Sequence, residues 1–357
     1  MKQTVESWAG KTIKPGERKR IILEIGRSFS GSNVNLPIMV WRSKEPGPVL
    51  GISAAVHGDE INGTGAIRSL IQDCPFELKR GSLIFVPVVN IMGFERHSRY
   101  MPDRRDLNRC FPGSAGGSLS ARLAKIIMSD VIERCDYLVD LHTAAVRRTN
   151  FPNVRADCSN EDCERLARAF GCEMIVNSSG PQGSLRAAAV NAGCPTIILE
   201  AGEVWKVEPA VLDLTRRGVM NVMIELGMID GELEVPPHQV TLEETRWVRS
   251  GIGGFLHFHV APGEPVVRGQ IVASSTSLLG KENEIIRSPN DGIIMGMTTM
   301  PAVGPGDPIF NIATPINKKQ QQKMEASIND LTEGTIETDI RTQLATNITV
   351  TDWEEEK

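Results

Sequence analysis

Three short stretches of the sequence place histidine and glutamate residues where they could bind a metal ion and activate water. In AVHGDEING, His57 follows an apolar run, and Glu60 comes three residues later at the start of a predicted helix. YLVDLHTA ends a second apolar run in His142, and TIILEAGE ends a third in Glu200. Two histidines and one carboxylate are the ligand set of a catalytic zinc site, and a remaining carboxylate can accept a proton from water.

Each stretch also has a simpler interpretation. A histidine and a glutamate three residues apart are common on surface helices, and a lone histidine at a strand end is commonly structural. Glu200 could instead be a charge at the N-terminus of a helix. The occurrence of all three stretches at predicted strand ends favours a catalytic site, because open α/β sheets form their ligand crevice at the carboxyl ends of the strands.

A fourth stretch, RYMPDRRDLNRCFPG, holds four arginines in a predicted loop: Arg99, Arg104, Arg105 and Arg109. The guanidinium fork matches a carboxylate or an oxyanion, so arginines beside a metal centre indicate recognition of such a group. The alternative is a surface loop that carries salt bridges.

The elements that must position these residues alternate between strands and helices over the first 230 residues. Helical periodicity predicts helices at 118–135, 160–170 and 209–228. Continuously apolar runs predict strands buried on both faces at 21–25, 36–42, 48–56, 82–90, 135–141, 172–177 and 196–200. This alternation indicates an α/β layer fold with a largely parallel sheet.

The pattern changes near residue 232. Residues 232–314 show short β runs and many turns without helical periodicity, which predicts a small all-β domain after a domain at 1–231. Residues 315–357 form a polar tail that we expect to pack loosely or to be disordered. Deleting this tail is therefore predicted to leave folding intact.

Composition narrows the class of protein. With 39 basic and 44 acidic residues, the net charge of 39 − 44 = −5 argues against a nucleic-acid partner. The one basic cluster, 18–20, is better explained as a solvated strand edge. No apolar run reaches the ~20 residues needed to span a membrane, and the polar N-terminus lacks a secretion signal. Seven irregularly spaced cysteines predict neither a disulfide framework nor a CxxC pair, so we expect a reducing cytoplasm.

HGDE, DLNRCFPG, DLHT and LEAGE, in this order, resemble the succinylglutamate desuccinylase/aspartoacylase family, which is related to the zinc carboxypeptidases. The resemblance covers about residues 20–314. It implies a three-layer α/β/α domain of the zinc-exopeptidase type, with a mostly parallel mixed sheet, followed by a small β domain.

The resemblance also assigns roles to residues. It implies one zinc ion per chain, bound by His57, Glu60 and His142, with Glu200 as the catalytic carboxylate. Asn108 and Arg109 fall on the pair that grips a substrate carboxylate. Arg99 fits the oxyanion-stabilising arginine, although a longer spacing to Asn108 leaves Arg104 and Arg105 as alternatives. Glu203 is the alternative to Glu200, and Asp140 is either a turn residue or a support for His142.

Within 232–314, the segments FHVAPGEPVVRGQIVAS and IIRSPNDGIIMGMTTM resemble a biotinyl/lipoyl-type barrel-sandwich hybrid. Carrier domains modify a lysine beside Met or Asp at the hairpin tip, but Lys281 lacks those neighbours. This domain is therefore predicted to be a structural cap or a contact between copies of the chain.

Together these features predict a zinc-dependent amidohydrolase that cleaves a linear amide, not a peptide bond, in a small carboxylate-bearing molecule such as an N-acyl amino acid. A zinc carboxypeptidase acting on short peptides is the nearest alternative. A non-catalytic binding protein on the same fold is less favoured, because the metal set and Glu200 are intact. We expect neither nucleic acid nor a membrane as partner, and a homo-oligomer is left open.

Overall fold

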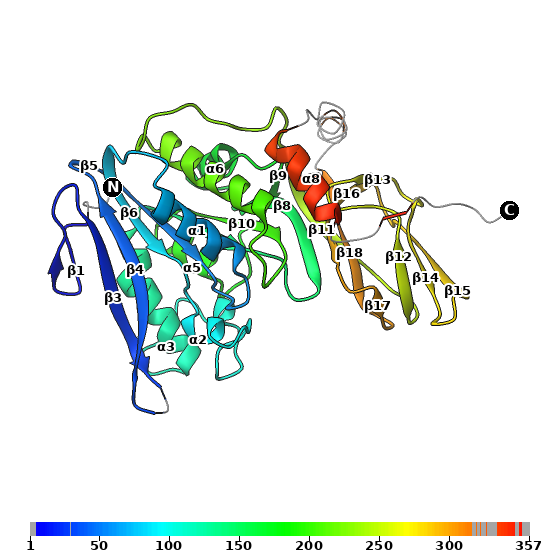
Figure 1. The fold of residues 1–357 in the computed structure, drawn as a ribbon, viewed down its shortest axis with the longest axis horizontal. Coiled ribbons are helices and arrows are strands. Elements are labelled where there is room, and N and C mark those ends of the chain that lie inside the picture. The colour runs from blue at the N-terminus through cyan, green and yellow to red at the C-terminus, as the bar shows by residue number, and fades with distance from the viewer. Residues whose placement is uncertain are drawn as a thin grey trace.

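The centre of the molecule is a twelve-stranded mixed β-sheet (Figure 1). The computed structural model describes residues 5–28, 30–315 and 334–346, and the single residues 319, 322, 326, 350 and 351. Four neighbouring strands run parallel: β6 (Arg80–Val86), β5 (Glu45–Ala54), β7 (Tyr137–His142) and β10 (Thr196–Gly202). Two antiparallel strands continue the sheet beyond β6: β4 (Asn33–Arg42) and β3 (Arg18–Arg27).

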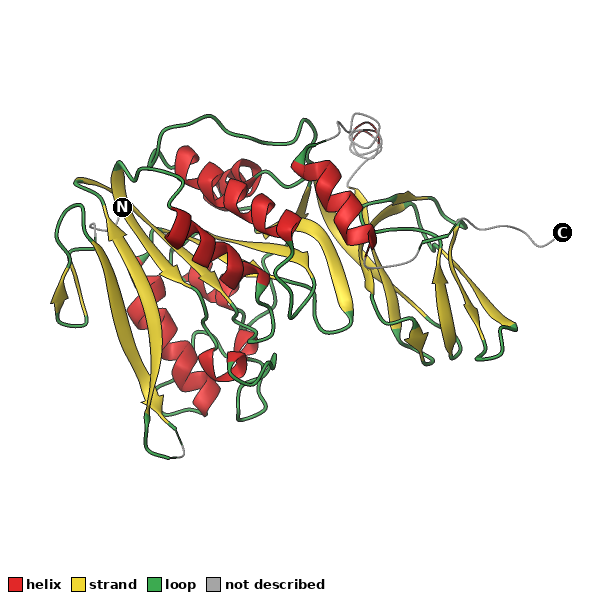
Figure 2. Ribbon diagram, in the orientation of Figure 1, coloured by secondary structure: helices red, strands yellow, loops and turns green. Residues whose placement is uncertain are grey.

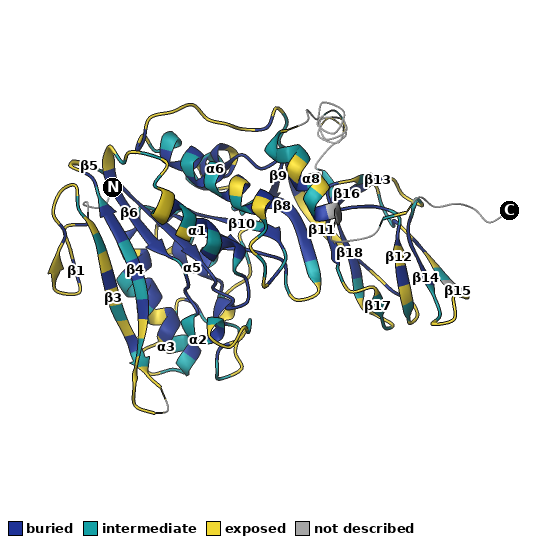
Figure 3. Cartoon of the chain, viewed as in Figure 1, coloured by how far each residue is buried: buried dark blue, intermediate teal, exposed yellow. Residues whose placement is uncertain are grey.

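Helices cover both faces of this sheet (Figure 2). On one face the helices are α1 (Asn62–Asp73), α4 (Glu161–Phe170) and α6 (Pro209–Glu225). On the other they are α3 (Leu119–Ile126) and α5 (Leu185–Asn191). Successive residues of β6 alternate between the two cores, Phe85 entering the first and Ile84 the second. Both faces are thus buried (Figure 3), as the continuously apolar runs predict.

The α/β class and the mixed sheet match the prediction. The helix expected at 118–135 is α3, followed by a π-helical turn (Ile127–Val131) and a 3-10 turn (Ile132–Arg134). Strand β8 (Arg148–Ala156) was not predicted. It pairs antiparallel with β10 and parallel with β9 (Met174–Asn177).

Four of the strands after residue 232 join the same sheet. β11 (Val240–Arg249) pairs parallel with β9 and antiparallel with β18 (Pro308–Pro315). β16 (Gly292–Thr298) pairs with β18, with β8 and with β13 (Pro265–Val266). A separate four-stranded sheet contains β12 (Gly254–Phe258), β14 (Ile271–Thr276), β15 (Glu282–Arg287) and β17 (Ala302–Val303). Residues 232–314 are thus all-β, whereas the boundary at 231 stays a prediction.

The expectation of a loosely packed tail is wrong for helix α8 (Ile336–Thr346). Ile340 and Leu344 are each only 2% exposed and join the core around α6. Arg341 bonds the Glu173 carboxylate and the Gly263 carbonyl, at 2.9 Å each. The polar composition of the tail masked two buried apolar residues, Ile340 and Leu344, which lie four residues apart. Most of 316–333 and 352–357 lies outside the described residues, so the expectation is not tested there.

Smaller elements among the described residues are α2 (Ile91–Phe94), β1 (Ser7–Trp8), β2 (Lys11–Thr12) and a 3-10 turn (Leu107–Arg109). The basic cluster 18–20 lies on β3, the terminal strand of the large sheet, as the sequence predicts. Among the residues described, no helix has the length and apolar character needed to cross a membrane.

Candidate active site

Three strands bring the histidines and the two glutamates to one edge of the sheet. His142 is the last residue of β7, and Glu200 lies directly beside it on the parallel neighbour β10. β5, on the other side of β7, ends at Ala54, three residues before His57. The chain then turns into α1, which begins at Asn62 and so places Glu60 above the strand ends.

His57, Glu60 and His142 form a buried cluster. The two oxygens of Glu60 face the two imidazoles: Oε1 lies 2.6 Å from Nδ1 of His57, and Oε2 lies 2.8 Å from Nδ1 of His142. One possible ligand atom from each of these residues lies within 4.8 Å of the others. The exposed fractions are 4%, 1% and 4%. The structure thus brings together the three residues that the sequence predicts as metal ligands.

Aspartates hold the other nitrogen of each ring. Asp106 Oδ1 lies 3.1 Å from Nε2 of His57, and Asp140 Oδ2 lies 2.8 Å from Nε2 of His142. Asp140 also accepts a hydrogen bond from the Ser53 hydroxyl at 2.7 Å. Such carboxylates orient metal-binding histidines and raise their basicity. Of the two interpretations of Asp140, the geometry matches the support for His142.

The electrostatics of the cluster follow from its charges. Burial lowers the pKa of both histidines, but the Glu60 and aspartate carboxylates outweigh burial and raise it. For the Glu60 carboxyl burial alone would raise the pKa, yet the two imidazoles hold it well below its usual range. A raised pKa of both histidines beside a lowered pKa of the Glu60 carboxyl means that this cluster favours positive charge, which a bound cation would also supply.

One buried atom tests whether a metal fits. Nδ1 of His57 is buried and has no hydrogen-bond partner of acceptable geometry among the described residues, although Glu60 lies close. A buried nitrogen directed at a carboxylate and a second imidazole nitrogen is what a coordinated cation requires. Nitrogen and carboxylate ligands in a His₂Glu set suit zinc. The residues present therefore fit the ion that the sequence predicts.

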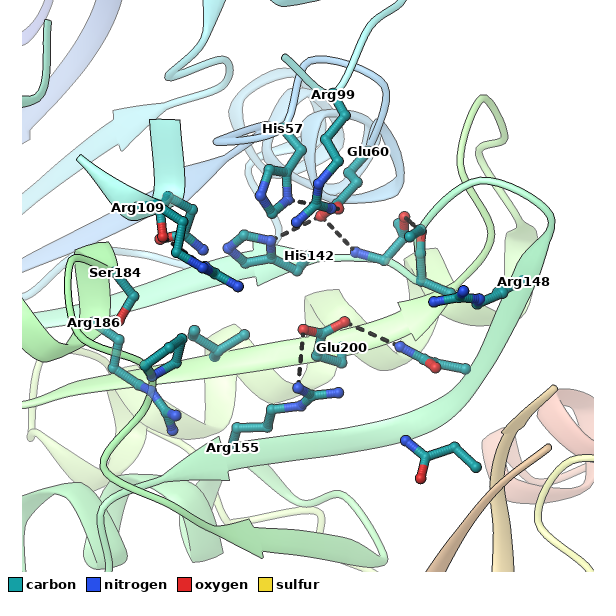
Figure 4. A pocket seen from close by; sticks show the side chains of 18 of the residues that line it. His57, Glu60, Arg99, Arg109, His142, Arg148, Arg155, Ser184, Arg186 and Glu200 are labelled. Atoms are coloured by element: carbon teal, nitrogen blue, oxygen red, sulfur yellow. Dashed lines mark hydrogen bonds and ion pairs between the residues drawn. The ribbon is translucent and has the colours of Figure 1, made fainter. Parts of the chain in front are cut away.

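Glu200 points into the same pocket (Figure 4). Its Oε2 accepts a hydrogen bond from the Asn150 amide at 3.0 Å, and its Oε1 lies 3.7 Å from the Arg155 guanidinium. Both partners come from β8, which pairs with β10. Glu203, the alternative carboxylate, bonds Lys206 and the Thr299 hydroxyl and does not line the pocket.

Of the three candidates for the oxyanion-stabilising arginine, Arg99, Arg104 and Arg105, the loop places Arg99 in the pocket. The Arg99 guanidinium bonds Glu60 Oε1 at 3.1 Å and Asp106 Oδ2 at 3.0 Å. Arg104 and Arg105 are exposed and do not line the pocket. Asp103 fixes the loop to the start of α3, accepting hydrogen bonds from Ser120 at 2.6 and 3.0 Å.

Asn108 and Arg109 also line the pocket. Asn108 is buried, and its Oδ1 accepts the backbone N–H of Leu185 at 2.8 Å, which ties the loop to α5. Arg109 is exposed, and its Nη1 donates to the Asn108 carbonyl at 2.6 Å. The backbone of Gly183 lies close to that of Arg109. A side chain would not fit there, because a Cβ on Gly183 would lie 2.6 Å from the Arg109 carbonyl oxygen.

Arg186, on α5, is a pocket residue that the sequence analysis missed. It is 3% exposed, and its Nε and Nη1 have no hydrogen-bond partner among the described residues. Burial, together with the charge of Arg155, lowers the pKa of its guanidinium to about 10, so the group still carries its charge at neutral pH. A single charged residue in the alanine-rich segment SLRAAA was the available signal.

The pocket holds about 200 Å³ and receives two further side chains from beyond residue 232. These are Trp247 on β11 and Asn311 on β18. The sequence analysis predicted no site role for that region, since sequence patterns do not show which strands pair across the domain boundary.

Comparison with known proteins bears on this geometry. The model of the succinylglutamate desuccinylase/aspartoacylase catalytic domain matches residues 46–226, about half of the chain. The chain belongs to this family. The match includes every predicted site residue from His57 to Glu200. Over 295 residues the chain is 28% identical to the N-alpha-acetyl-L-2,4-diaminobutyric acid deacetylase of Halomonas elongata, a match that covers 78% of this chain and 86% of that enzyme.

Solved structures show the same fold. The product-bound ectoine utilization protein EutE (DoeB) from Ruegeria pomeroyi superposes with a TM-score of 0.75 at 22% identity, covering 85% of this chain and 97% of that one. A succinylglutamate desuccinylase/aspartoacylase from Rhodobacter sphaeroides gives 0.73 at 24% identity, with 85% and 97% covered. At this identity the likeness establishes the fold alone.

Proposed function

We propose that this protein is a zinc-dependent amidohydrolase that removes the acyl group from an N-acyl amino acid or a similar small carboxylate-bearing amide. The observation that carries the proposal is the position of Glu200, beside His142 on the neighbouring strand and facing the His57–Glu60–His142 cluster in one pocket. The match to the family and the deacetylase of Halomonas elongata support the same chemistry.

In this proposal residues of the chain bind the metal ion, transfer the proton and position the catalytic carboxylate. His57, Glu60 and His142 hold one zinc ion, which when bound acts as a Lewis acid and lowers the pKa of water from about 15.7 to about 7. The Glu200 carboxylate accepts a proton from the attacking water and passes it to the leaving amine. Asn150 and Arg155 hold that carboxylate in place.

Two groups of residues bind the substrate. The Arg99 guanidinium, fixed by Glu60 and Asp106, stabilises the negative charge that develops on the amide oxygen. Arg109 and Asn108 grip the carboxylate beside the scissile amide, and the buried charge of Arg186 attracts the same group.

The size of the pocket favours a small substrate over a peptide. About 200 Å³ is less than the roughly 300–1,000 Å³ typical of pockets for drug-sized ligands. An N-acyl amino acid fits this space better than a peptide chain does, which favours a deacylase over the carboxypeptidase alternative.

We infer the division into two structural units and the cellular compartment from the same family membership. Residues 1–231 form the three-layer catalytic unit, and residues 232–314 form the barrel-sandwich-like unit. The seven cysteines, all free, agree with the cytoplasm as the compartment.

The test is a deacylase screen. Zinc-loaded full-length protein is incubated with N-acetyl, N-succinyl and N-aspartyl amino acids and with short peptides, and the released amine is quantified. Release from the N-acyl amino acids, lost after chelation and restored by zinc, supports the proposal. Release from the peptides alone favours the carboxypeptidase, and no release from any compound contradicts the proposal.

A further inference from the structure

Strand pairing fixes His142, but not His57 or Glu60, relative to Glu200. His142 lies beside Glu200 because β7 and β10 pair directly. His57 and Glu60 lie beyond the end of β5, in a turn at residues 55–61 that leads into α1 and belongs to no strand. Contacts of that turn with its surroundings must therefore set where these two residues lie relative to Glu200.

Glu208 makes such a contact with Asn62, the first residue of α1. Glu208 Oε2 accepts a hydrogen bond from Asn62 Nδ2 at 2.8 Å, and the backbone N–H of Glu208 donates to Asn62 Oδ1, also at 2.8 Å. Asn62 is 2% exposed and lies two residues after Glu60. The two bonds hold the start of α1, and with it the end of the turn that contains Glu60, against residue 208.

The same carboxylate oxygen of Glu208 also holds the turn that follows Glu200. It accepts the backbone N–H of Glu203 at 2.9 Å. It lies so close to Gly202, whose φ is +71°, that a Cβ there would overlap it. One oxygen atom therefore bonds both the turn after the proposed catalytic carboxylate and the start of the helix after Glu60.

Glu208 lies directly before α6, where a simpler role is to cap that helix. Residues at this position commonly bond the first N–H groups of the helix. The Glu208 side chain makes no such bond, and the Ala210 N–H donates instead to Gln343 Oε1 of α8 at 3.0 Å. α1 and α6 lie side by side on one face of the sheet (Figure 1). The carboxylate of Glu208 is thus directed away from its own helix and toward α1.

We propose that Glu208 is a positioning residue for the reaction. Through the bonds of its carboxylate it sets where the turn containing Glu60 lies relative to Glu200. It does not line the pocket, so it acts through these two parts of the site and not on the substrate. The attacking water must lie within reach of both parts, and a small displacement of either lowers the rate. The inference rests on the proposed hydrolysis and goes beyond it by assigning a role to a residue outside the pocket.

Two substitutions separate the position of the Glu208 carboxylate from its charge. Glu208→Ala removes the shared acceptor, and we expect kcat to fall by roughly 10- to 100-fold while KM changes less than about threefold. Glu208→Gln removes the charge but keeps a carbonyl oxygen that can accept both hydrogen bonds, so it should keep most of kcat. The matched control is Asp213→Ala, which removes an exposed carboxylate from α6 and should leave kcat unchanged.

The assays use zinc-loaded full-length protein and the N-acetyl, N-succinyl and N-aspartyl amino acids of the deacylase screen. Asn62→Ala breaks the same contact from the other side and should lower kcat to a similar extent, so it replaces Glu208→Ala if that variant does not fold. If both residues act through one contact, the double variant should lose little more than either single variant. Zinc content should stay unchanged, because none of these substitutions removes a metal ligand.

A spectrum that does not depend on turnover separates this inference from the proposed function. Co²⁺ takes the place of zinc as the probe, because zinc with its filled d shell has no visible absorption. We expect Glu208→Ala, but neither Glu208→Gln nor Asp213→Ala, to change the visible spectrum of the Co²⁺-loaded protein. Unchanged kcat and spectrum in Glu208→Ala, or equal losses of kcat in Glu208→Ala and Glu208→Gln, overturn the positioning role. The expected spectral pattern without hydrolysis of any compound by the unmutated protein supports the positioning role and overturns the proposed hydrolysis.

Discussion

Each histidine of the candidate metal centre lies between two carboxylates, with Glu60 close to one ring nitrogen and an aspartate at the other. We expect His57→Ala and His142→Ala to lose bound zinc, because each removes one of three protein ligands. The purified protein should contain about one zinc per chain, measured by elemental analysis after dialysis. His238→Ala, which changes a histidine outside the pocket, is the control. Full metal content in both ligand variants would show that the metal assignment is wrong.

Glu200 and Glu203 allow a paired test of the catalytic carboxylate. We expect Glu200→Gln to keep zinc and fold but to lower kcat by roughly 10²–10⁴, the usual effect of removing a general base. Glu203→Gln should keep most of kcat, because Glu203 contacts Lys206 and Thr299 outside the pocket. The reverse pattern of rates would move the catalytic role to Glu203.

Arg109 carries a prediction about geometry rather than charge. Arg109→Lys keeps the charge but loses the paired donors that match a carboxylate, so we expect kcat/KM to fall. A lost charge-assisted hydrogen bond costs about 1.5–3 kcal/mol, which corresponds to roughly 10–150-fold. Substrates with a masked carboxylate should be poor and insensitive to the substitution. Equal turnover of masked and free acids by the unmutated protein would contradict the carboxylate clamp.

At the scale of elements, β8 shows where prediction from sequence ends. The segment RTNFPNVRA contains a proline and two asparagines, so it lacks the apolar run by which the other strands were recognised. Three of its polar residues, Arg148, Asn150 and Arg155, line the pocket, and the sequence analysis missed them because it did not recognise the strand. The metal cluster could be predicted because its residues follow apolar strands, whose carboxyl ends must meet.

β16 contributes a residue that acts by having no side chain. A Cβ on Gly296 would lie 2.6 Å from Oδ1 of Asn150, the residue whose amide holds Glu200. We expect Gly296→Ala to displace this amide and lower kcat by roughly 10- to 100-fold without loss of zinc. Kinetics and metal content of the same samples test this. Gly304→Ala, where the nearest atom to an added Cβ lies 3.7 Å away, should be neutral.

A double-mutant cycle shows whether Gly296 acts through Asn150. If it does, Gly296→Ala should add little to the loss already caused by Asn150→Ala. Additive losses would mean that the glycine matters for another reason, such as the pairing of β16 with β8.

At the scale of the whole molecule, α8 reverses the prediction that the tail is dispensable. We expect deletion of residues 334–357 to lower the unfolding midpoint, because Ile340 and Leu344 leave the core. Leu344→Ala alone should lower the free energy of unfolding by about 2–5 kcal/mol. Thr342→Ala, at an exposed position of the same helix, is the control. An unchanged denaturation midpoint after deletion would restore the original prediction.

The continuous sheet explains why the domain description from sequence was incomplete. The short β runs and turns after residue 232 predicted a separate all-β domain, but β11 pairs with β9 across that point. Strand pairing depends on the position of elements distant in the sequence, and a local pattern carries no record of it. The residues contributed by this pairing, Trp247 and Asn311, were therefore beyond prediction.

The far end of the sheet has a consequence for how the molecules behave in crowded solution. β3 is ten residues long, and among the described residues its one partner strand is β4, so no described strand pairs with its outer edge. Such edges template aggregation unless charges keep a second strand away. Arg18 and Arg20 are exposed on this edge, whereas Lys19 between them is paired with Glu17 at 2.9 Å. We expect the two exposed arginines to repel those of a second copy that approaches edge to edge, which would disfavour growth of the sheet into a fibril.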